Sequence, residues 1–359
     1  MIRNSLIKVM NGRDLSESEM EKTMADIFDG RVSPAQAGAF VTALRYKEET
    51  VDEIVGAARA LAARVQCINL SDSLLNLARD DINIESETVI ETSDSGKTGT
   101  RTFNISTATA FVLAGSGVNV VRHGNRSASM YFGAADVLMN LEINLDLTVP
   151  DIEHCIQETG VGFLFTTINS GPMKHVAPVR EEIGIRTIFN LIGPLANPAR
   201  STSHILGVYK SSLTQKMADV LNRLGAQKAL VTYGHETHDE VSICGPTDIS
   251  RLKNGQVESS VIEPEQFGFK TVDPSAIAGG NARENARIIR LVLDGERGPK
   301  RDVVLLNAAA ALVAARQDIS MEEGIAIATE AIDSGMAKKK LRALVDFTAG
   351  QSSFIRKAL

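Results

Sequence analysis

The feature that most constrains this chain is a change of hydrophobic period after about residue 65. From there on, short apolar runs typical of buried strands alternate with stretches of helical spacing. The apolar runs lie at 88–90, 118–121, 163–165, 205–208 and 229–233, and the helical patterns at 106–116, 133–142, 150–158, 212–224, 281–295, 302–316 and 320–347. This alternation predicts an α/β fold with a mostly parallel central sheet and helices on its faces.

The first 65 residues show helical spacing alone. Phe40, Val41 and Leu44 recur at helical intervals, and Ser16 and Ser33 are suited to N-caps. We therefore expect a small helical domain ahead of a larger α/β domain. The expected division is 1–68 for the helical domain, completed by helices within about 170–190, 69–349 for the α/β domain, and 350–359 for a tail.

Composition excludes several classes of protein. A net charge of -6 and a pI near 5.6 disfavour a surface that neutralises nucleic-acid phosphates, so we expect no nucleic-acid partner. Cys67, Cys155 and Cys244 lie far apart, which suits a reducing compartment better than a disulfide framework. No apolar run reaches the length of a signal or membrane segment, so we expect a cytoplasmic protein without a membrane partner.

The loop 94–100 follows a strand pattern and leads into a helix that begins near Ser106. This order of elements directs backbone amides and the positive end of a helix dipole at an anion. Glu91 occupies the position where a nucleotide-binding P-loop requires its first glycine, so that motif is rejected. An ordinary strand-to-helix turn capped by Ser106 or Thr107 is an equally good interpretation of this segment alone.

Two polar stretches follow other apolar runs. Residues 122–126 come directly after the run at 118–121, where open α/β sheets bind ligands at the carboxyl ends of their strands. Asp239 and Glu240 lie just past the run at 229–233, so their carboxylates are expected at the same edge. Adjacent carboxylates suit a magnesium ion that keeps waters and bridges to a phosphate, although a solvated acidic loop is the alternative.

Arg180 is a candidate for binding a carboxylate, because a guanidinium offers paired donors to a planar anion. Glu181 and Glu182 follow it, so a surface ion pair is the competing interpretation.

Taken in order, these stretches resemble the anthranilate phosphoribosyltransferase family. The matching residues lie at 102–107 (Thr-Phe-Asn-Ile-Ser-Thr), 123–126 (His-Gly-Asn-Arg), 133–138 (Gly-Ala-Ala-Asp-Val-Leu), 173–176 (Met-Lys-His-Val), 186–190 (Arg-Thr-Ile-Phe-Asn) and 239–240 (Asp-Glu). The similarity covers nearly the whole chain. It implies the nucleoside-phosphorylase-like phosphoribosyltransferase fold, and usually a homodimer formed through the helical domain.

The resemblance also implies an activity. This is the magnesium-dependent transfer of a phosphoribosyl group from phosphoribosyl pyrophosphate to the amine of anthranilate or a related aromatic amino acid, as in tryptophan biosynthesis. The implied donor-binding residues are Ser95, Gly96, Gly99, Thr102, Asn104, Ser106, Thr107 and Arg122. Those implied for the acceptor are His123, Asn125 and Arg180, and those for magnesium are Asp239 and Glu240. No residue is assigned as a general acid or base, because positioning and electrostatics supply the acceleration.

Several motifs differ from the family pattern. Its Gly-Thr-Gly-Gly-Asp-Gly loop is Asp94-Ser95-Gly96-Lys97-Thr98-Gly99 here, its Ser-Ser-Lys is Ser129-Met130-Tyr131, its His-Pro is Ser170-Gly171, and Arg122 stands where it normally has Lys. Two alternatives therefore stay open: a paralogue with another donor or acceptor, and a non-catalytic dimeric binding protein, of nucleic acid for example, on the same scaffold.

Overall fold

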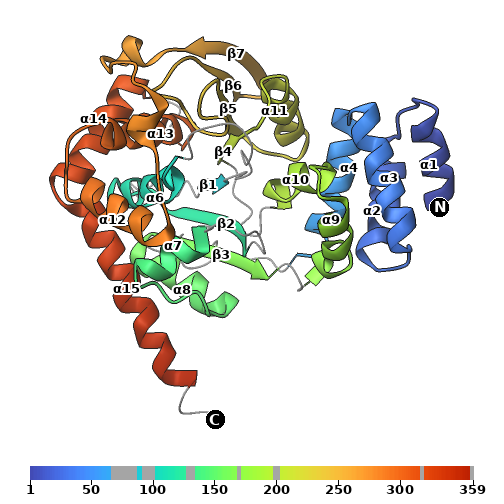
Figure 1. Cartoon of the computed structure of the whole chain (residues 1–359), viewed down its shortest axis with the longest axis horizontal. Coiled ribbons are helices and arrows are strands. Elements are labelled where there is room, and N and C mark those ends of the chain that lie inside the picture. Colours follow the sequence, from blue (N-terminus) through green and yellow to red (C-terminus); the bar gives the residue numbers. More distant parts are fainter. Residues whose placement is uncertain are drawn as a thin grey trace.

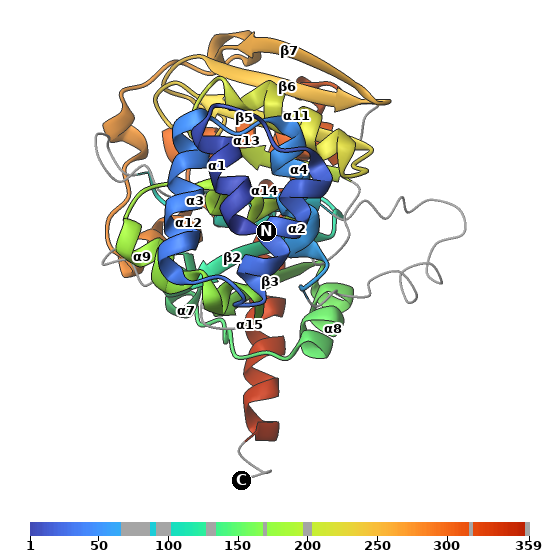
Figure 2. The ribbon, with the colours of Figure 1, turned by 90° about the vertical axis from the view of Figure 1, so that its right-hand side faces the viewer.

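The computed structural model describes residues 1–65, 87–90, 102–126, 134–167, 171–196, 203–315 and 319–355. A group of N-terminal helices lies to one side of an α/β part, and Figures 1 and 2 show the two from perpendicular directions. This arrangement confirms the predicted fold class.

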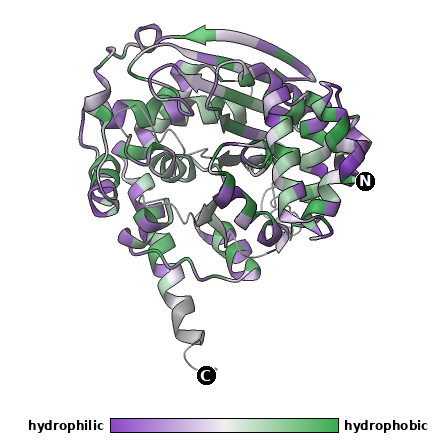
Figure 3. Cartoon of the chain, turned by 45° about the vertical axis from the view of Figure 1, so that its right-hand side comes forward, coloured by the Kyte–Doolittle hydropathy of each residue, from purple (hydrophilic) through white to green (hydrophobic). Residues whose placement is uncertain are grey.

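The N-terminal helices are α1 (Ile2–Met10), α2 (Glu17–Phe28), α3 (Pro34–Lys47) and α4 (Val51–Ala62). Ser16, Ser33 and Thr50 cap α2, α3 and α4, each through a capping box with a Glu or Gln three residues later. Each helix carries both hydrophobic and hydrophilic residues, as amphipathic helices in a bundle do (Figure 3). Helix α4 packs closely against the backbone of α2 at Glu17, because Gly56 has no side chain at this point.

Within the described residues, seven strands form one sheet in the order β3-β2-β1-β4-β5-β6-β7. They are β1 (Glu87–Ile90), β2 (Val120–Arg126), β3 (Val161–Thr167), β4 (Ser203–Gly207), β5 (Lys228–Gly234), β6 (Thr247–Lys253) and β7 (Gln256–Ile262). Strands β1 to β5 pair in parallel, and β6 and β7 add an antiparallel edge. The strand order reverses between β1 and β4, and ligands bind beside the carboxyl ends at such a switch point.

Helices cover both faces of the sheet. They are α6 (Ile105–Gly115), α7 (Ala134–Asn140), α8 (Val149–Thr159), α11 (Leu213–Arg223), α12 (Ala282–Leu293), α13 (Pro299–Ala315), α14 (Met321–Asp333) and α15 (Met336–Ile355). Ile205 and Leu230 belong to the core formed with α6 and α12 to α15, whereas Leu206 and Val231 belong to the core shared with α11 and the N-terminal helices. Successive strand residues thus point to opposite faces, as the pleat of a β-strand requires.

A linking segment runs between the sheet and the N-terminal helices. It contains the short 3₁₀ turns η1 (Gly171–His175) and η2 (Pro194–Ala196) and the helices α9 (Ala177–Ile183) and α10 (Ile188–Ile192). Helix α9 contacts α3 and α10 contacts α4, and Val179 and Ile188 are buried in the core of the N-terminal helices. Two further 3₁₀ turns, η3 (Pro264–Phe267) and η4 (Pro274–Ile277), follow β7.

Three sequence predictions need correction, and two strands were missed. Residues 122–126 were expected after a strand but belong to β2, because β3 pairs with them as far as Thr167. The single helix expected at 320–347 is divided into α14 and α15 at Gly335, whose φ of 74° suits glycine. The tail expected from Gly350 begins as a continuation of α15 to Ile355. Strands β6 and β7 were not expected.

No helix in the part of the chain that the structure describes combines the length and the apolar character that crossing a bilayer requires.

Candidate functional site

The candidate site lies at the carboxyl ends of β1 and β4. Helix α6 follows β1 in the sequence, and the segment with Asp239 and Glu240 follows β5, the neighbour of β4. Parallel strands place all these ends at one edge of the sheet. The topology therefore brings the residues predicted for the donor in α6 and those predicted for magnesium to the same switch point.

The first half is the N-terminus of α6. Thr102 forms an isolated antiparallel bridge with Ala278, the buried Phe103 donates its N–H to the Ile277 carbonyl at 3.3 Å, and Asn104 is the N-cap. Ser106 and Thr107 lie in the first turn, where backbone amides and the helix dipole favour an anion.

Ser106 supplies an observation that points to a ligand. Its hydroxyl is buried, and none of the described residues gives its Oγ a hydrogen-bond partner. A buried hydroxyl without a partner is unfavourable by about 1–3 kcal/mol. An anion seated at this helix end would remove that penalty.

The second half is the turn that follows β5. Gly234 and His238 exchange two backbone hydrogen bonds of 2.6 and 2.7 Å, and His238 has a positive φ of 61°. The turn brings Asp239 back against β4, so closely that a Cβ on Gly207 would lie 2.6 Å from the Asp239 carbonyl carbon. The acidic pair is thereby held at the end of β4, beside the switch point.

Glu240 is only 7% exposed, and the next residue, Val241, is held by Asn307 of α13. The Asn307 Nδ2 donates to the Val241 carbonyl at 2.9 Å, while its Oδ1 accepts from the Val241 N–H at 2.9 Å. The sequence places Asn307 only within the helical pattern at 302–316. Its place on a buried helix face, where an amide needs partners, was the available signal.

The acidic pair fits magnesium as a partial set of ligands. Among the described residues, no group of three or more His, Cys, Asp or Glu side chains is placed to enclose a metal ion. Magnesium prefers oxygen ligands and usually keeps waters and substrate phosphate oxygens in its shell. Two adjacent carboxylates at the edge where an anion would bind suit such a shared ion.

Arg180, which was predicted to bind the acceptor, lies half-buried in α9. The segment that follows α9 is held against the sheet edge by Tyr209, which comes just after β4. The Arg186 guanidinium stacks 4.5 Å from the centre of the Tyr209 ring, and Arg45 Nη1 of α3 donates to the Tyr209 hydroxyl at 3.2 Å. The sequence did not single out Tyr209 or Arg45 for this role.

The remaining predicted residues are placed only in part. Ser95, Gly96 and Gly99 lie outside the described residues. Arg122, His123 and Asn125 are located by their backbone in β2, where they pair with Phe163, Leu164 and Thr166 of β3.

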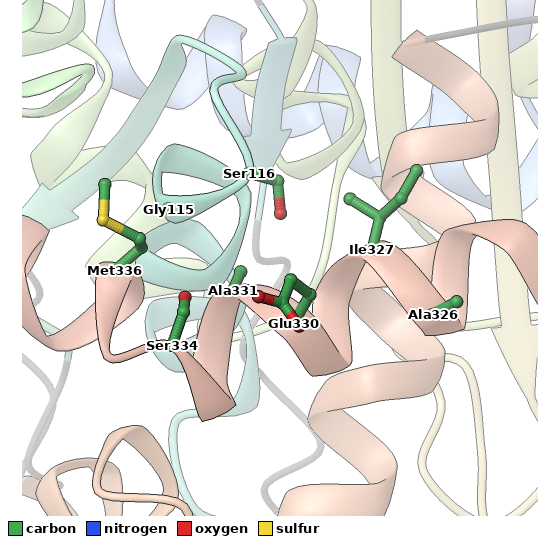
Figure 4. A pocket seen from close by; sticks show the side chains of 8 residues that line it. All are labelled: Gly115, Ser116, Ala326, Ile327, Glu330, Ala331, Ser334 and Met336. Carbon is green, nitrogen blue, oxygen red and sulfur yellow. The ribbon is translucent and has the colours of Figure 1, made fainter.

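A separate pocket lies at the other end of α6 (Figure 4). It is lined by Gly115, Ser116, Ala326, Ile327, Glu330, Ala331, Ser334 and Met336. Because a helix of 11 residues is roughly 16 Å long, this pocket is distant from the N-terminus of α6. It therefore does not belong to the candidate site.

Comparison with known proteins matches both parts of the chain. Residues 3–65 match the helical bundle domain of a glycosyl transferase family, and residues 86–338 match its α/β domain. The anthranilate phosphoribosyltransferases of Geobacter sulfurreducens and Pelobacter propionicus are 47% and 46% identical, each over 97% of this chain and 99% of the relative.

Solved structures of anthranilate phosphoribosyltransferases are also similar to this chain. The anthranilate phosphoribosyltransferase of Thermus thermophilus is 34% identical, with a TM-score of 0.83 over 96% of this chain and 99% of its own. The enzyme of Saccharomyces cerevisiae, solved with PRPP (phosphoribosyl pyrophosphate) and Mg, is 24% identical and has the same fold, with a TM-score of 0.82 over 97% of this chain and 98% of its own.

Proposed function

Because the chain belongs to the anthranilate phosphoribosyltransferase family, we propose that it transfers the phosphoribosyl group of phosphoribosyl pyrophosphate to the amine of anthranilate or a related aromatic acid. One observation supports this most: two features lie at one switch point of the sheet. They are a helix N-terminus suited to an anion, which carries the buried Ser106 hydroxyl, and the acidic pair Asp239 and Glu240. A leaving diphosphate and its metal require such a pairing.

On the donor side, we propose that Asn104, Ser106 and Thr107 hold the diphosphate. The bond between ribose C1 and the diphosphate oxygen breaks, a bond from C1 to the amine nitrogen forms, and the amine loses one proton. As the first bond breaks, negative charge grows on the diphosphate, and the N-terminal dipole of α6 stabilises it. Asp239 and Glu240 would hold magnesium, which supplies further neutralisation of the leaving group when bound.

On the acceptor side, we propose that Arg180 pairs with the carboxylate of the aromatic acid through two parallel hydrogen bonds. The stacking of Arg186 on Tyr209 supports this role, because it holds the segment after α9 against the sheet edge. His123 and Asn125, in β2 on the other side of β1, would complete the acceptor's surroundings.

We also propose the division into a helical domain of residues 1–68, with helices from 170–190, and an α/β domain of 69–349. The packing of α9 and α10 against α3 and α4 supports this division.

We propose a cytoplasmic homodimer that forms through the helical domain and serves tryptophan biosynthesis. The exposed apolar side chains of Ile7, Met10 and Tyr46 on that domain support the dimer, since Tyr46 is 93% exposed and the other two exceed half. The buried thiols of Cys155 and Cys244 suit a reducing compartment.

The altered loop at 94–99 favours one second candidate, a paralogue that uses another donor. Lys97 and Asp94 replace glycines that allow close backbone approach to phosphate in the family pattern. Such a paralogue would keep the acceptor site and metal pair but fail to turn over phosphoribosyl pyrophosphate.

A turnover assay tests the proposal. The purified chain should consume anthranilate, followed by its fluorescence, only when phosphoribosyl pyrophosphate and Mg²⁺ are both present. Asp239→Asn combined with Glu240→Gln should abolish this turnover, whereas Glu236→Gln, which alters an exposed carboxylate of the same turn, should leave it unchanged. Full activity of the double variant would refute the role of the acidic pair.

A further inference from the structure

We propose that Asn285 of α12 is a positioning residue of the donor site, because it determines which end of the Asn104 amide faces the diphosphate. This inference rests on the proposed function. It concerns a residue that does not itself touch the substrate but acts through one that does.

The orientation of the Asn285 amide follows from a backbone group. The Gly280 N–H donates to Asn285 Oδ1 at 2.8 Å. A backbone N–H is only a donor, so the atom that it contacts must be the amide oxygen. The other end of the Asn285 side chain is therefore its NH₂ group.

That NH₂ group in turn orients Asn104. Asn285 Nδ2 donates to Asn104 Oδ1 at 3.1 Å, which leaves the Asn104 NH₂ pointing away from α12. Among the residues that the structure describes, nothing accepts a hydrogen bond from Asn104 Nδ2. Two donor hydrogens are thus presented at the N-terminus of α6, where an anion needs donors.

The surroundings of Asn285 prevent its side-chain amide from flipping. Asn285 is 5% exposed, and a reversed amide would place its NH₂ against the Gly280 N–H, so that two donors would face each other and the bond between them would be lost. Gly279 brings the chain within close reach of Phe103, where a Cβ would lie 2.8 Å from the Phe103 Cα. The segment before α12 and the start of α6 are therefore locked together.

The variant Asn285→Asp should reverse the orientation of the Asn104 amide. One carboxylate oxygen still accepts from Gly280, but the other now demands a donor, so the Asn104 amide must rotate and turn its oxygen toward the diphosphate. We expect at least a tenfold loss of affinity for phosphoribosyl pyrophosphate with Mg²⁺ by calorimetry, because a donor to a charged group is replaced by an acceptor. The KM of the acceptor should change less than about twofold.

A double-variant cycle tests whether Asn285 acts through Asn104. Asn104→Ala alone should weaken donor binding, and adding Asn285→Asp to it should cause no further loss. Asn285→Ala, which releases Asn104 without reversing it, should give a smaller loss than Asn285→Asp and serves if the Asp variant does not fold. Losses that multiply when Asn104→Ala is combined with Asn285→Asp, or with Asn285→Ala, would overturn the proposal.

The matched control is Asn222→Asp on α11, since Asn222 is likewise a helix asparagine whose Nδ2 donates a hydrogen bond, in this case to the Gly255 carbonyl at 3.0 Å. Donor affinity should be unchanged in this variant. A loss equal to that of Asn285→Asp would show a general effect of the added charge and would overturn the proposal.

A readout without substrate separates this inference from the proposed function. With ¹⁵N-labelled asparagine side chains, the Asn104 NH₂ signal, assigned by its loss in Asn104→Ala, should shift in Asn285→Asp and stay in place in Asn222→Asp. An unmoved Asn104 signal in Asn285→Asp would overturn the positioning role. If the wild type binds no phosphoribosyl pyrophosphate, the proposed function fails, and the NMR result alone decides the orientation of Asn104.

Discussion

Gly207→Ala tests the placement of the acidic pair most sharply. Gly207 ends β4, and a Cβ there would lie 2.6 Å from both the carbonyl carbon and the Cβ of Asp239, and closer still to its carbonyl oxygen. Real Cβ atoms essentially never approach other atoms within 3.0 Å. Because the obstacle is backbone and not a flexible side chain, the strand and the acidic segment must separate.

The size of the effect follows from that separation. A displacement on the order of 1 Å at reacting groups can lower turnover by about 100-fold. Overpacking of this kind costs about 1–3 kcal/mol, which lowers the melting temperature by roughly 2–12 °C for a domain of this size. Gly207→Ala should therefore lose far more Mg²⁺-dependent activity than its modest loss of stability explains.

Gly245→Ala is the matched control. The nearest atom to its added Cβ would be Glu236 Cγ at 3.6 Å, an ordinary van der Waals distance. Turnover at saturating and limiting Mg²⁺, with a thermal melt of each variant, measures both effects. Gly207→Ala with activity and metal dependence equal to those of Gly245→Ala would refute the claim that Asp239 must lie against β4.

Three other predictions concern the acceptor and the junction of α3 and α4. Arg180→Ala should raise the acceptor KM about tenfold or more and the donor KM less than about twofold, because only the acceptor loses a paired carboxylate contact. Arg287→Ala, which removes an exposed arginine, is the control. Equal changes in the two KM values, or the same changes in the control, would contradict this role. Glu48→Gly should raise the free energy of unfolding in urea by about 1 kcal/mol, because Glu48 has φ 69° and ψ 129°, and its exposed pair with Lys210 contributes little; a less stable variant would contradict the strain. Burial raises the pKa of the Glu49 carboxyl above its ordinary value of 4.5, so this group lowers stability as pH rises through its folded pKa. Glu49→Gln, which cannot ionise, should melt above the wild type at about pH 8 and equal it at about pH 4, and a constant difference would show that ionisation is not the cause.

The parallel part of the fold could be predicted because buried strands are apolar throughout. Strands β1, β4 and β5 overlap the apolar runs at 88–90, 205–208 and 229–233. Strand β2 shows the limit of that signal, since Gly124 and Asn125 are poor strand formers and yet pair with β3. Their conformation depends on a partner strand that is distant in sequence.

Two turns that the hydrophobic pattern does not reveal carry local sequence signals. Asn254 and Gly255, with φ of 52° and 75°, form the two-residue turn between β6 and β7, and Asn-Gly is a strong hairpin signal. Gly335 is a helix stop of the usual kind. Turn residues of this kind mark the ends of helices and strands, which hydrophobic period alone does not locate.

The sequence predicts candidate site residues but not the residues that hold them in place. Asp239 and Glu240 were predicted because they follow a strand pattern, and Asn104 because its motif resembles that of the family. Asn285 and Asn307 stand alone in helical sequences, and only the packing of α12 and α13 brings them to the Asn104 amide and the Val241 backbone. Residues that act by holding another residue leave no local pattern.

The most direct test of the account is a crystal structure of the chain with phosphoribosyl pyrophosphate and Mg²⁺. The account predicts diphosphate at the N-terminus of α6, within hydrogen-bond distance of Asn104 and Ser106, and a metal ion shared with the Asp239 and Glu240 segment. A diphosphate bound elsewhere, or a sheet edge blocked by this chain's own side chains, would contradict it.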